Sequence, residues 1–211
     1  MGSQHLTLAD PPVDGVHTGR RERKKAATRR KIADTALRLF LERGYDAVGI
    51  REVAAEADVA VTTVFSHFAS KEALVFEQDE DFEQRLTKAV TERSPDESLL
   101  PALRREIHAM VRHCTADGAA PVWRMIDGSP ALRGYEESMR LRHAESLATA
   151  IAAASQLRPG PAPTTTACRA IARFAIDAFS LAREAADPEA TVDEVFRMIE
   201  AAWAALPTGA A

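Results

Sequence analysis

Apolar residues recur along most of this 211-residue chain at intervals of three and four, the spacing of amphipathic helices. No region shows the sustained alternation of apolar and polar residues that is typical of half-buried strands. Aromatic residues make up only 6% of the chain, which also favours an all-α fold. The pattern predicts about nine helices, over residues 28–43, 50–57, 61–68, 71–93, 97–116, 121–126, 130–156, 164–186 and 191–206.

The second and third of these helices are short and are separated only by the tight turn Asp58-Val59-Ala60. Val64 and Phe68 lie four residues apart on the third helix and are expected to face inward. Two short helices joined in this way predict a helix-turn-helix, whose second helix enters the major groove of DNA.

The outward residues of that helix suit contacts with DNA. Small hydroxyl groups reach base edges or phosphates without filling the groove, and basic side chains donate to the phosphate backbone. The residues predicted to contact DNA from this region are Gly49, Thr62, Thr63, Phe65, Ser66, His67 and Lys71.

A strongly basic segment directly precedes the helix-turn-helix. Residues 20–31 hold eight basic residues and one acidic residue, a local charge of +7 in a chain whose net charge is −4. Such asymmetry is typical of a nucleic-acid-binding end on an acidic protein. We interpret the segment as an arm that follows phosphates or enters the minor groove; the alternative is an ordinary solvated charge run. The predicted contacts in the arm are Arg20, Arg21, Arg23, Lys24, Lys25 and Arg29.

Residues 58–74 resemble the signature of TetR-type transcriptional regulators, in which a Gly-Val-Ser turn is followed by Thr, Tyr, Phe and Pro-Ser-Lys-Glu. The resemblance extends upstream through Ala33, Leu37, Phe40, Gly44-Tyr45 and Ile50-Val53-Ala54 and covers about a quarter of the chain. It implies an N-terminal three-helix DNA-binding head followed by a larger helical body for ligand binding and dimerisation.

This chain departs from the signature at four positions. Asp58 stands where the family usually has Gly, and Asp tolerates a left-handed turn better than most residues. Ala60 and Gly49 stand where the family has capping hydroxyl residues, which weakens both helix starts. Phe65 replaces a Tyr whose hydroxyl in the family typically touches phosphate.

The pattern and the resemblance together predict three segments: a disordered leader over residues 1–19, the DNA-binding domain with its basic arm over 20–72, and the effector-binding and dimerisation domain over 73–211. The last two helices carry apolar residues at helical spacing, and we expect them to form a four-helix bundle with a second copy. Packing within one chain is the alternative. The expected interface residues are Ala172, Ala175, Phe179, Ala182, Val195, Phe196, Ile199 and Trp203.

The middle helices are expected to enclose an effector pocket lined by aromatic and sulfur-containing residues with a few polar anchors. Each of these residues also suits an ordinary apolar core. The candidates are Phe82, Arg105, His108, Met110, Trp123, Met125, Tyr135, Met139 and Phe174.

Other classes of function have weaker support. We predict no metal site and no cofactor, because the His and Cys residues lack metal-ligand spacing, and Cys114 and Cys168 suggest no disulfide framework. No phosphate-binding loop or nucleophile motif predicts an enzyme. No 18-residue apolar run or signal peptide is present, which predicts a cytoplasmic protein without a membrane span.

The sequence therefore predicts a ligand-responsive regulator, most simply a repressor, that binds a palindromic double-stranded DNA operator as a homodimer and is released by a small-molecule effector. The alternative is a helical adaptor whose basic arm binds RNA or an anionic surface without sequence selectivity.

Overall fold

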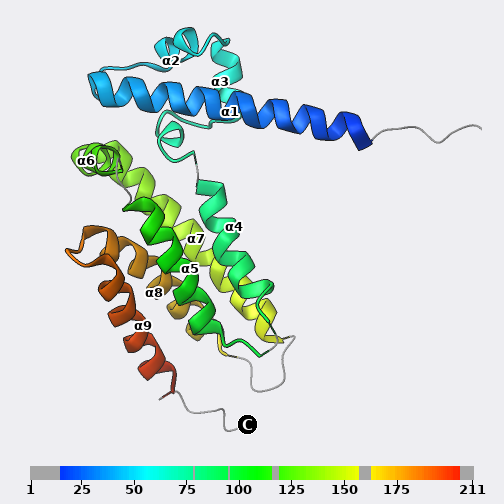
Figure 1. Ribbon diagram of the computed structural model, residues 1–211, viewed down its shortest axis with the longest axis vertical. Coiled ribbons are helices and arrows are strands. Elements are labelled where there is room, and N and C mark those ends of the chain that lie inside the picture. The colour runs from blue at the N-terminus through cyan, green and yellow to red at the C-terminus, as the bar shows by residue number, and fades with distance from the viewer. Residues whose placement is uncertain (1–14, 78, 95, 116–118, 157–162, 205–211) are drawn as a thin grey trace, which may run out of the picture. The chain divides into compact units, whose positions relative to one another are not determined.

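The computed structural model describes residues 15–77, 79–94, 96–115, 119–156 and 163–204; of residues 15–18, 79–81 and 203–204 it describes the backbone alone. Within these ranges the chain forms nine α-helices and one short 3-10 helix, and no strand (Figure 1). The predicted all-α class is confirmed. The chain divides into two compact units, Met1–Val75 and Phe76–Ala211.

The first unit contains α1 (Gly15–Arg43), α2 (Ile50–Glu56), α3 (Val61–His67) and the 3-10 helix η1 (Glu72–Leu74). Helices of seven residues are too short to be stable alone in water, so α2 and α3 depend on burying one face against α1. The buried core that joins them consists of Ile32, Ala33, Ala36, Leu39, Phe40, Tyr45, Val48, Val53, Ala54, Ala57, Val64, Phe68 and Leu74.

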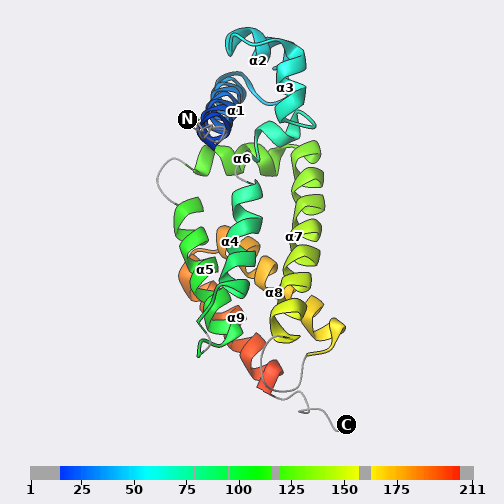
Figure 2. The ribbon, with the colours of Figure 1, turned by 90° about the vertical axis from the view of Figure 1, so that its right-hand side faces the viewer.

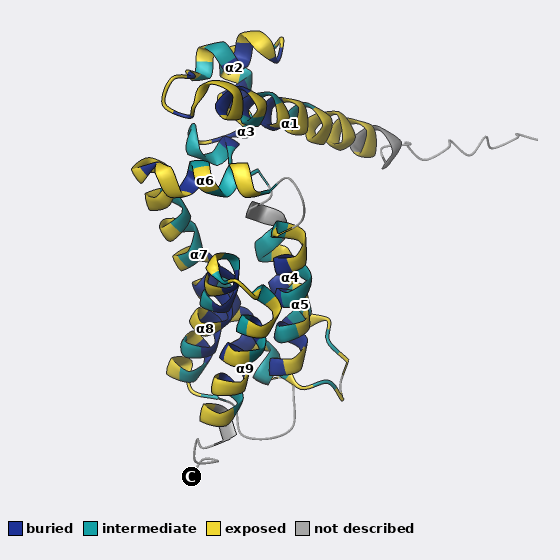
Figure 3. Ribbon diagram, turned by 60° about the vertical axis from the view of Figure 1, so that its left-hand side comes forward, coloured by how far each residue is buried: buried dark blue, intermediate teal, exposed yellow. Residues whose placement is uncertain are grey.

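Helix α1 begins well before the predicted start at Thr28 and runs on past the other helices of its unit (Figure 1). Of the expected leader, residues 1–14 lie outside the described residues, whereas residues 15–19 belong to α1. The Arg, Lys, Glu and Ala residues that precede Thr28 are strong helix formers, and nothing in that stretch stops the helix. Residues 20–27 are all exposed, as Figure 3 shows along α1.

Two residues with left-handed backbone shape the helix ends of this unit. Gly44 has a φ of 93°, and its amide donates to the Phe40 carbonyl at 2.9 Å, which ends α1. Asp58 has a φ of 52° in the turn between α2 and α3, as the sequence predicts. The helix-turn-helix geometry is therefore kept although Asp replaces the more permissive Gly.

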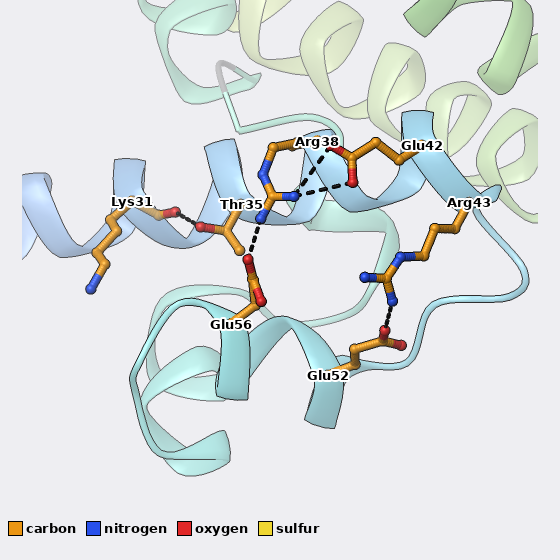
Figure 4. Close-up of polar contacts among 7 residues, drawn as sticks. All are labelled: Lys31, Thr35, Arg38, Glu42, Arg43, Glu52 and Glu56. Carbon is orange, nitrogen blue, oxygen red and sulfur yellow. Dashed lines mark hydrogen bonds and ion pairs between the residues drawn. The ribbon is translucent and has the colours of Figure 1, made fainter.

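Ion pairs connect α1 to α2 (Figure 4). Arg38 on α1 bridges Glu42 one turn along its own helix and Glu56 on α2, and Arg43 pairs with Glu52 at the other end of α2. These side chains are 41–53% exposed, so solvent screens each pair and its contribution to stability is small. They orient α2, whereas the apolar core supplies most of the stability.

The second unit contains α4 (Asp79–Thr91), α5 (Leu99–Cys114), α6 (Ala120–Gly128), α7 (Pro130–Gln156), α8 (Thr165–Glu184) and α9 (Pro188–Ala204) (Figure 2). Helix α8 packs against α5, α7 and α9, while α4 packs against α5 and α7. None of the helices in the described ranges is long and apolar enough to cross a membrane.

One predicted helix, whose residues belong to both units, is divided. The sequence pattern gives a single helix over 71–93, but the structure has η1 and then α4 from Asp79. The Phe76 ring, between them, stacks on Tyr135 of α7 at 5.4 Å. Local periodicity does not predict this tertiary contact.

Most of the predicted dimer-interface residues are buried inside the single protomer. Ala172, Ala175 and Ala182 have no exposed surface, and α8 needs small residues there because three helices approach it closely. The side chain of Trp203 lies outside the described residues. This burial disfavours the predicted partner contacts, which no second copy tests here, because the residues already lie in the core of the protomer: Ala172, Ala175, Phe179, Ala182, Val195, Phe196 and Ile199.

Candidate nucleic-acid interface and effector site

Helix α3 presents one apolar face to its own unit and one mixed face to solvent. Val64 is 1% exposed, whereas Thr62, Phe65 and Ser66 are all exposed, Phe65 by 53%. Residues at i, i+3 and i+4 share one face of a helix. Thr62, Phe65 and Ser66 thus form a continuous outward face, and Thr63 is partly buried at its edge.

Arg29 of α1 holds the C-terminal end of α3. Its Nη1 donates to the His67 carbonyl at 2.5 Å, and its guanidinium lies 4.4 Å from the centre of the Phe68 ring. A cation is favourable at the negative end of a helix and over an aromatic face. Arg29 was predicted to bind DNA as part of the arm, but its geometry indicates a structural role.

His67 is also less suited to phosphate than the sequence suggests. Partial burial lowers the pKa of His67, and the nearby cations Arg29 and Lys25 lower it further. The imidazole of the DNA-free chain is therefore mainly neutral at pH 7.

The Lys71 side chain contacts Tyr45 within the first unit. Its ammonium donates to the Tyr45 carbonyl at 2.5 Å and lies 4.0 Å from the centre of the Tyr45 ring. The Tyr45 hydroxyl in turn donates to Glu72 at 2.8 Å. This geometry gives Lys71 a structural role, and because an ammonium has three N–H donors the phosphate contact stays a prediction beside it.

The remaining arm residues keep their side chains in solvent. Residues 20–25 are exposed on α1, and none of their basic side chains has an ion pair among the described contacts. Gly49 is exposed at the start of α2 with an ordinary extended backbone, and α2 has no side-chain cap there. Helix α3 likewise lacks a side-chain cap at Ala60, as the sequence predicts.

The candidate pocket residues of the second unit lie in several different environments rather than around one site. Phe174 is 52% exposed, and Arg105 is 61% exposed and paired with Glu97. Met110 is 2% exposed in the core. The exposure of Phe174 and Arg105 does not favour a place in a pocket, and Met110 lies in the core; periodicity alone cannot tell a pocket from a core or a surface.

Three other candidates make specific contacts. The Phe82 ring stacks on His143 at 5.2 Å and meets Phe179 edge-on at 4.9 Å. Tyr135 stacks on Phe76, and the indole N–H of Trp123 donates to the Cys114 carbonyl at 2.9 Å. Met125 and Met139 are partly buried on α6 and α7.

His108, the remaining candidate, connects α5 to α9. Its Nε2 lies 2.6 Å from a carboxylate oxygen of Asp193, which also accepts from Arg104 Nε at 2.9 Å. These hydrogen bonds, from Arg104 first and His108 second, lower the pKa of Asp193. His108 therefore belongs to a polar contact between two helices.

The comparisons with known proteins agree with the helix-turn-helix. Residues 32–77 match the family model described as bacterial regulatory proteins, tetR family. The HTH-type transcriptional regulator TcmR of Streptomyces glaucescens is 29% identical over 122 residues, a match that spans 54% of either chain. The HTH-type transcriptional repressor Rv3405c of Mycobacterium tuberculosis is 30% identical over 141 residues, covering 64% of this chain and 74% of the repressor. The chain belongs to the TetR family.

Solved structures support the same fold. The SmeT–triclosan complex superposes with a TM-score of 0.57 at 19% sequence identity, covering 83% of this chain and 91% of that one. The segment that matches the TetR-family model begins at residue 32, after the basic run. The functional interpretation of residues 20–31 therefore rests on their charge and exposure alone.

The second unit of this TetR-family protein also holds a polar cluster that the sequence analysis missed. Arg183 of α8 is only 8% exposed and lies between Glu136 of α7 and Trp123 of α6. One sequence feature could have indicated that Arg183 is buried: it lies four residues after the buried Phe179, on the same apolar face of α8. Its partners come from other helices, so local sequence did not reveal them.

Replacement of Lys71 tests its structural role. Because Lys71→Met keeps the aliphatic stem but removes the hydrogen bond and the cation–π contact, we expect the free energy of unfolding to fall by about 1 kcal/mol. Urea unfolding followed by circular dichroism measures it, and Lys88→Met, at an exposed position of α4, is the matched control. Equal stability of the two variants, with DNA affinity reduced only by Lys71→Met, would favour the phosphate contact over the structural role.

The contact between α5 and α9 is expected to depend on pH. A lowered folded-state pKa means that Asp193 stabilises the fold above its unfolded pKa near 3.8, and that this contribution disappears as the pH falls through the lower folded value. Asp193 is 42% exposed, so solvent screening limits the effect of Asp193→Asn to about 1 kcal/mol at pH 7.

Urea titrations at several pH values should show this difference shrinking below pH 3.8. Glu189→Gln removes a 3.5 Å pair that is 58% exposed on the same helix, and it should have little effect at any pH. A difference for Asp193→Asn that persists unchanged in acid would show that the ion pair is not its cause.

Proposed function

We propose that this TetR-family protein is a ligand-responsive repressor that binds a palindromic operator as a homodimer in the cytoplasm and leaves it when a small molecule binds the second unit. The observation that carries the proposal is the outward face of α3, where two hydroxyl side chains and one aromatic ring are exposed while the opposite face is buried against α1. This arrangement suits insertion of α3 into the major groove.

The Thr62 hydroxyl is suited to base edges or phosphates, and the exposed ring of Phe65 is suited to apolar contact with a thymine methyl group. The Ser66 hydroxyl donates to the Thr63 carbonyl at 2.7 Å, so it offers a base edge an acceptor. An exposed aromatic ring on a helix loses apolar hydration when it is covered, which favours a buried position in a complex. Phe65 lacks the hydroxyl found in the family signature, so its contribution would be apolar contact rather than a hydrogen bond to phosphate.

The part of α1 that extends beyond the other helices of its unit, residues 20–27, is called the projecting part; we propose that it binds the phosphate backbone of DNA. Arg20 and Lys24, like Arg21 and Lys25, are like charges four residues apart, which disfavours the isolated helix. Phosphates would relieve this repulsion, so we propose Arg20, Arg21, Arg23, Lys24 and Lys25 as the contacts.

A second copy of the chain would cover the outer face of α8 and α9. Phe174 and Leu181 on α8 are 52% and 51% exposed, and Met198 on the adjacent α9 is 59% exposed. Phe174 and Leu181 are seven residues apart and share one helix face. Two such helix pairs, related by a two-fold axis, would form a four-helix bundle and place two copies of α3 on a symmetric site.

Relief of repression by a ligand is supported by the fold and by the ligand of a structural neighbour. The related SmeT structure is a complex with triclosan, a small molecule. By analogy, we place the effector of this chain in its helical second unit. Such a ligand lowers DNA affinity only if it binds the DNA-free conformation more tightly than the DNA-bound one.

Salt dependence of DNA binding tests the arm. With duplexes from the DNA flanking the gene, we expect sequence-selective binding whose log affinity falls steeply with log salt concentration. Arg21→Gln should reduce that slope by about 0.9 for each phosphate that the arm no longer neutralises, because fewer counterions are released. Arg169→Gln, at an exposed position of α8, is the control with the same change of charge and should leave the slope unchanged.

Equal affinity for all duplexes would instead support a sequence-blind adaptor. A slope that Arg21→Gln leaves unchanged would remove the arm from the DNA-binding surface.

Phe174→Glu tests the proposed dimer. A carboxylate in an apolar interface loses hydration without gaining a partner, so we expect the dimer dissociation constant to rise at least tenfold, about 1.4 kcal/mol. Sedimentation equilibrium measures it, and Leu141→Glu, at a 49% exposed position of α7, is the matched control. A wild-type monomer, or dimers of equal affinity in both variants, would contradict this interface.

A further inference from the structure

Arg183 near the end of α8 is a buried cation with unused hydrogen-bonding capacity. Its side chain is 8% exposed, and its guanidinium lies 4.3 Å from the centre of the Trp123 ring. Its Nη2 is 3.3 Å from Glu136, while Nη1 is 3.7 Å from Asp127, too far for a hydrogen bond. The buried Nε and Nη1 atoms have no hydrogen-bond partner in the structure.

This arrangement is costly for a residue that serves packing alone. A guanidinium carries five N–H donors, and a buried donor without an acceptor loses its hydration without compensation. An apolar side chain of similar length would fill the same space without that loss. The unpaired N–H groups therefore point to an acceptor that arrives from outside the chain.

The charges around Arg183 restrict what that acceptor can be. Glu136 is 13% exposed, and the more exposed carboxylates of Asp127 and Glu184 each lie 3.7 Å from the guanidinium. Arg183 thus faces three carboxylates, and Arg140, the other cation near Glu136, is itself paired with Glu137 and Asp177, so a further anion would be repelled. A cationic group such as an ammonium has no lone pair to offer the N–H groups. The unpaired N–H groups of Arg183 therefore suit a neutral hydrogen-bond acceptor.

The surroundings of Arg183 favour an acceptor atom that belongs to an apolar molecule. Burial raises the pKa of the Glu136 carboxyl, although Arg183 and Arg140 oppose the shift, which indicates a poorly solvated environment. Burial also raises the pKa of Cys114, whose carbonyl accepts the Trp123 indole N–H, so its thiol is neutral. An aromatic ring and a neutral thiol are suited to an apolar molecule.

We propose that Nε–H and Nη1–H of Arg183 are the polar anchor of the effector site, and that the effector is a neutral, largely apolar molecule with a carbonyl oxygen. This inference rests on the proposed ligand response of the second unit and gives it a chemical class and a position, between α6, α7 and α8. Glu136 positions the guanidinium from one side and Trp123 from its face.

A matched series of naphthalenes tests the chemistry. The probes are 2-acetylnaphthalene, with a carbonyl oxygen, 2-isopropylnaphthalene, of the same shape without an acceptor, and 2-naphthoate, with a charged carboxylate. Affinity is measured on the full chain by quenching of tryptophan fluorescence. One charge-assisted hydrogen bond should make the acetyl compound bind about tenfold more tightly than the isopropyl compound, and the naphthoate should bind more weakly than the acetyl compound.

Two variants test whether Arg183 causes the preference for the acetyl over the isopropyl compound. Arg183→Met should reduce the tenfold ratio to about one, because it keeps the stem and removes the donors. Arg169→Met, on an exposed turn of the same helix, should keep the ratio. Arg183→Met is a substitution at a buried site, so a measurement on the wild-type protein accompanies it: the Arg183 Nε–H signal in a proton–nitrogen correlation spectrum should shift on addition of 2-acetylnaphthalene and not of 2-isopropylnaphthalene.

Several results would overturn the proposal. These are equal binding of the acetyl and isopropyl compounds, no saturable binding of the acetyl compound, a ratio unchanged in Arg183→Met, or an Nε–H signal that does not move, as expected if only water pairs with it. DNA binding by the ligand-free protein is measured separately. If the ligand-free protein does not bind DNA, the proposed repressor function is refuted, whereas the results of the naphthalene series are unaffected.

Discussion

Two helices of seven residues cannot persist in water by their own hydrogen bonds, and the DNA-binding unit is built around this constraint. Helix α1 supplies the apolar surface on which α2 and α3 fold, and that surface decides which face of α3 is buried. With Val64 and Phe68 turned inward, Thr62, Phe65 and Ser66 must turn outward. The proposed contacts with DNA are therefore a consequence of packing against α1.

Polar contacts refine this arrangement at its ends. Arg38 and Arg43 of α1 pair with α2, and Arg29 of the same helix holds the carbonyl end of α3. Lys71 and Tyr45 close the unit on the side of η1. The basic residues that were predicted to contact DNA therefore form two groups. Those on the projecting part of α1 remain in solvent, whereas Arg29 and Lys71 stabilise the unit.

The sequence predicted the helix-turn-helix well because its determinants are local. The apolar spacing at Ile50, Val53 and Val64 and the left-handed turn at Asp58 are all contained within about twenty residues. The start of α1 was missed because a charged run that favours helix looks the same whether it is solvated coil or helix. The intramolecular contacts of Arg29 and Lys71 were not predicted, because their partners lie 38 and 26 residues away.

The second unit was harder to predict for a related reason. Apolar periodicity on α8 is strong, yet it does not say whether Ala172 and Ala175 face α5, α7, α9 or a second copy. The buried cluster of Arg183, Glu136 and Trp123 draws one residue from each of three helices. A single helical stripe contains only one member of such a cluster, so its chemistry appears only in the folded chain.

The central claim is that α1 fixes the outward face of α3 and that this face selects DNA sequence in symmetric pairs. Selection of duplexes from a random-sequence pool, by the wild-type protein and by Phe65→Ala in parallel, tests it most directly. The account predicts that the wild type enriches a sequence with two-fold symmetry, and that Phe65→Ala relaxes the preference at one symmetry-related pair of positions only. No enriched sequence, or the same preference at every position for both proteins, would contradict it.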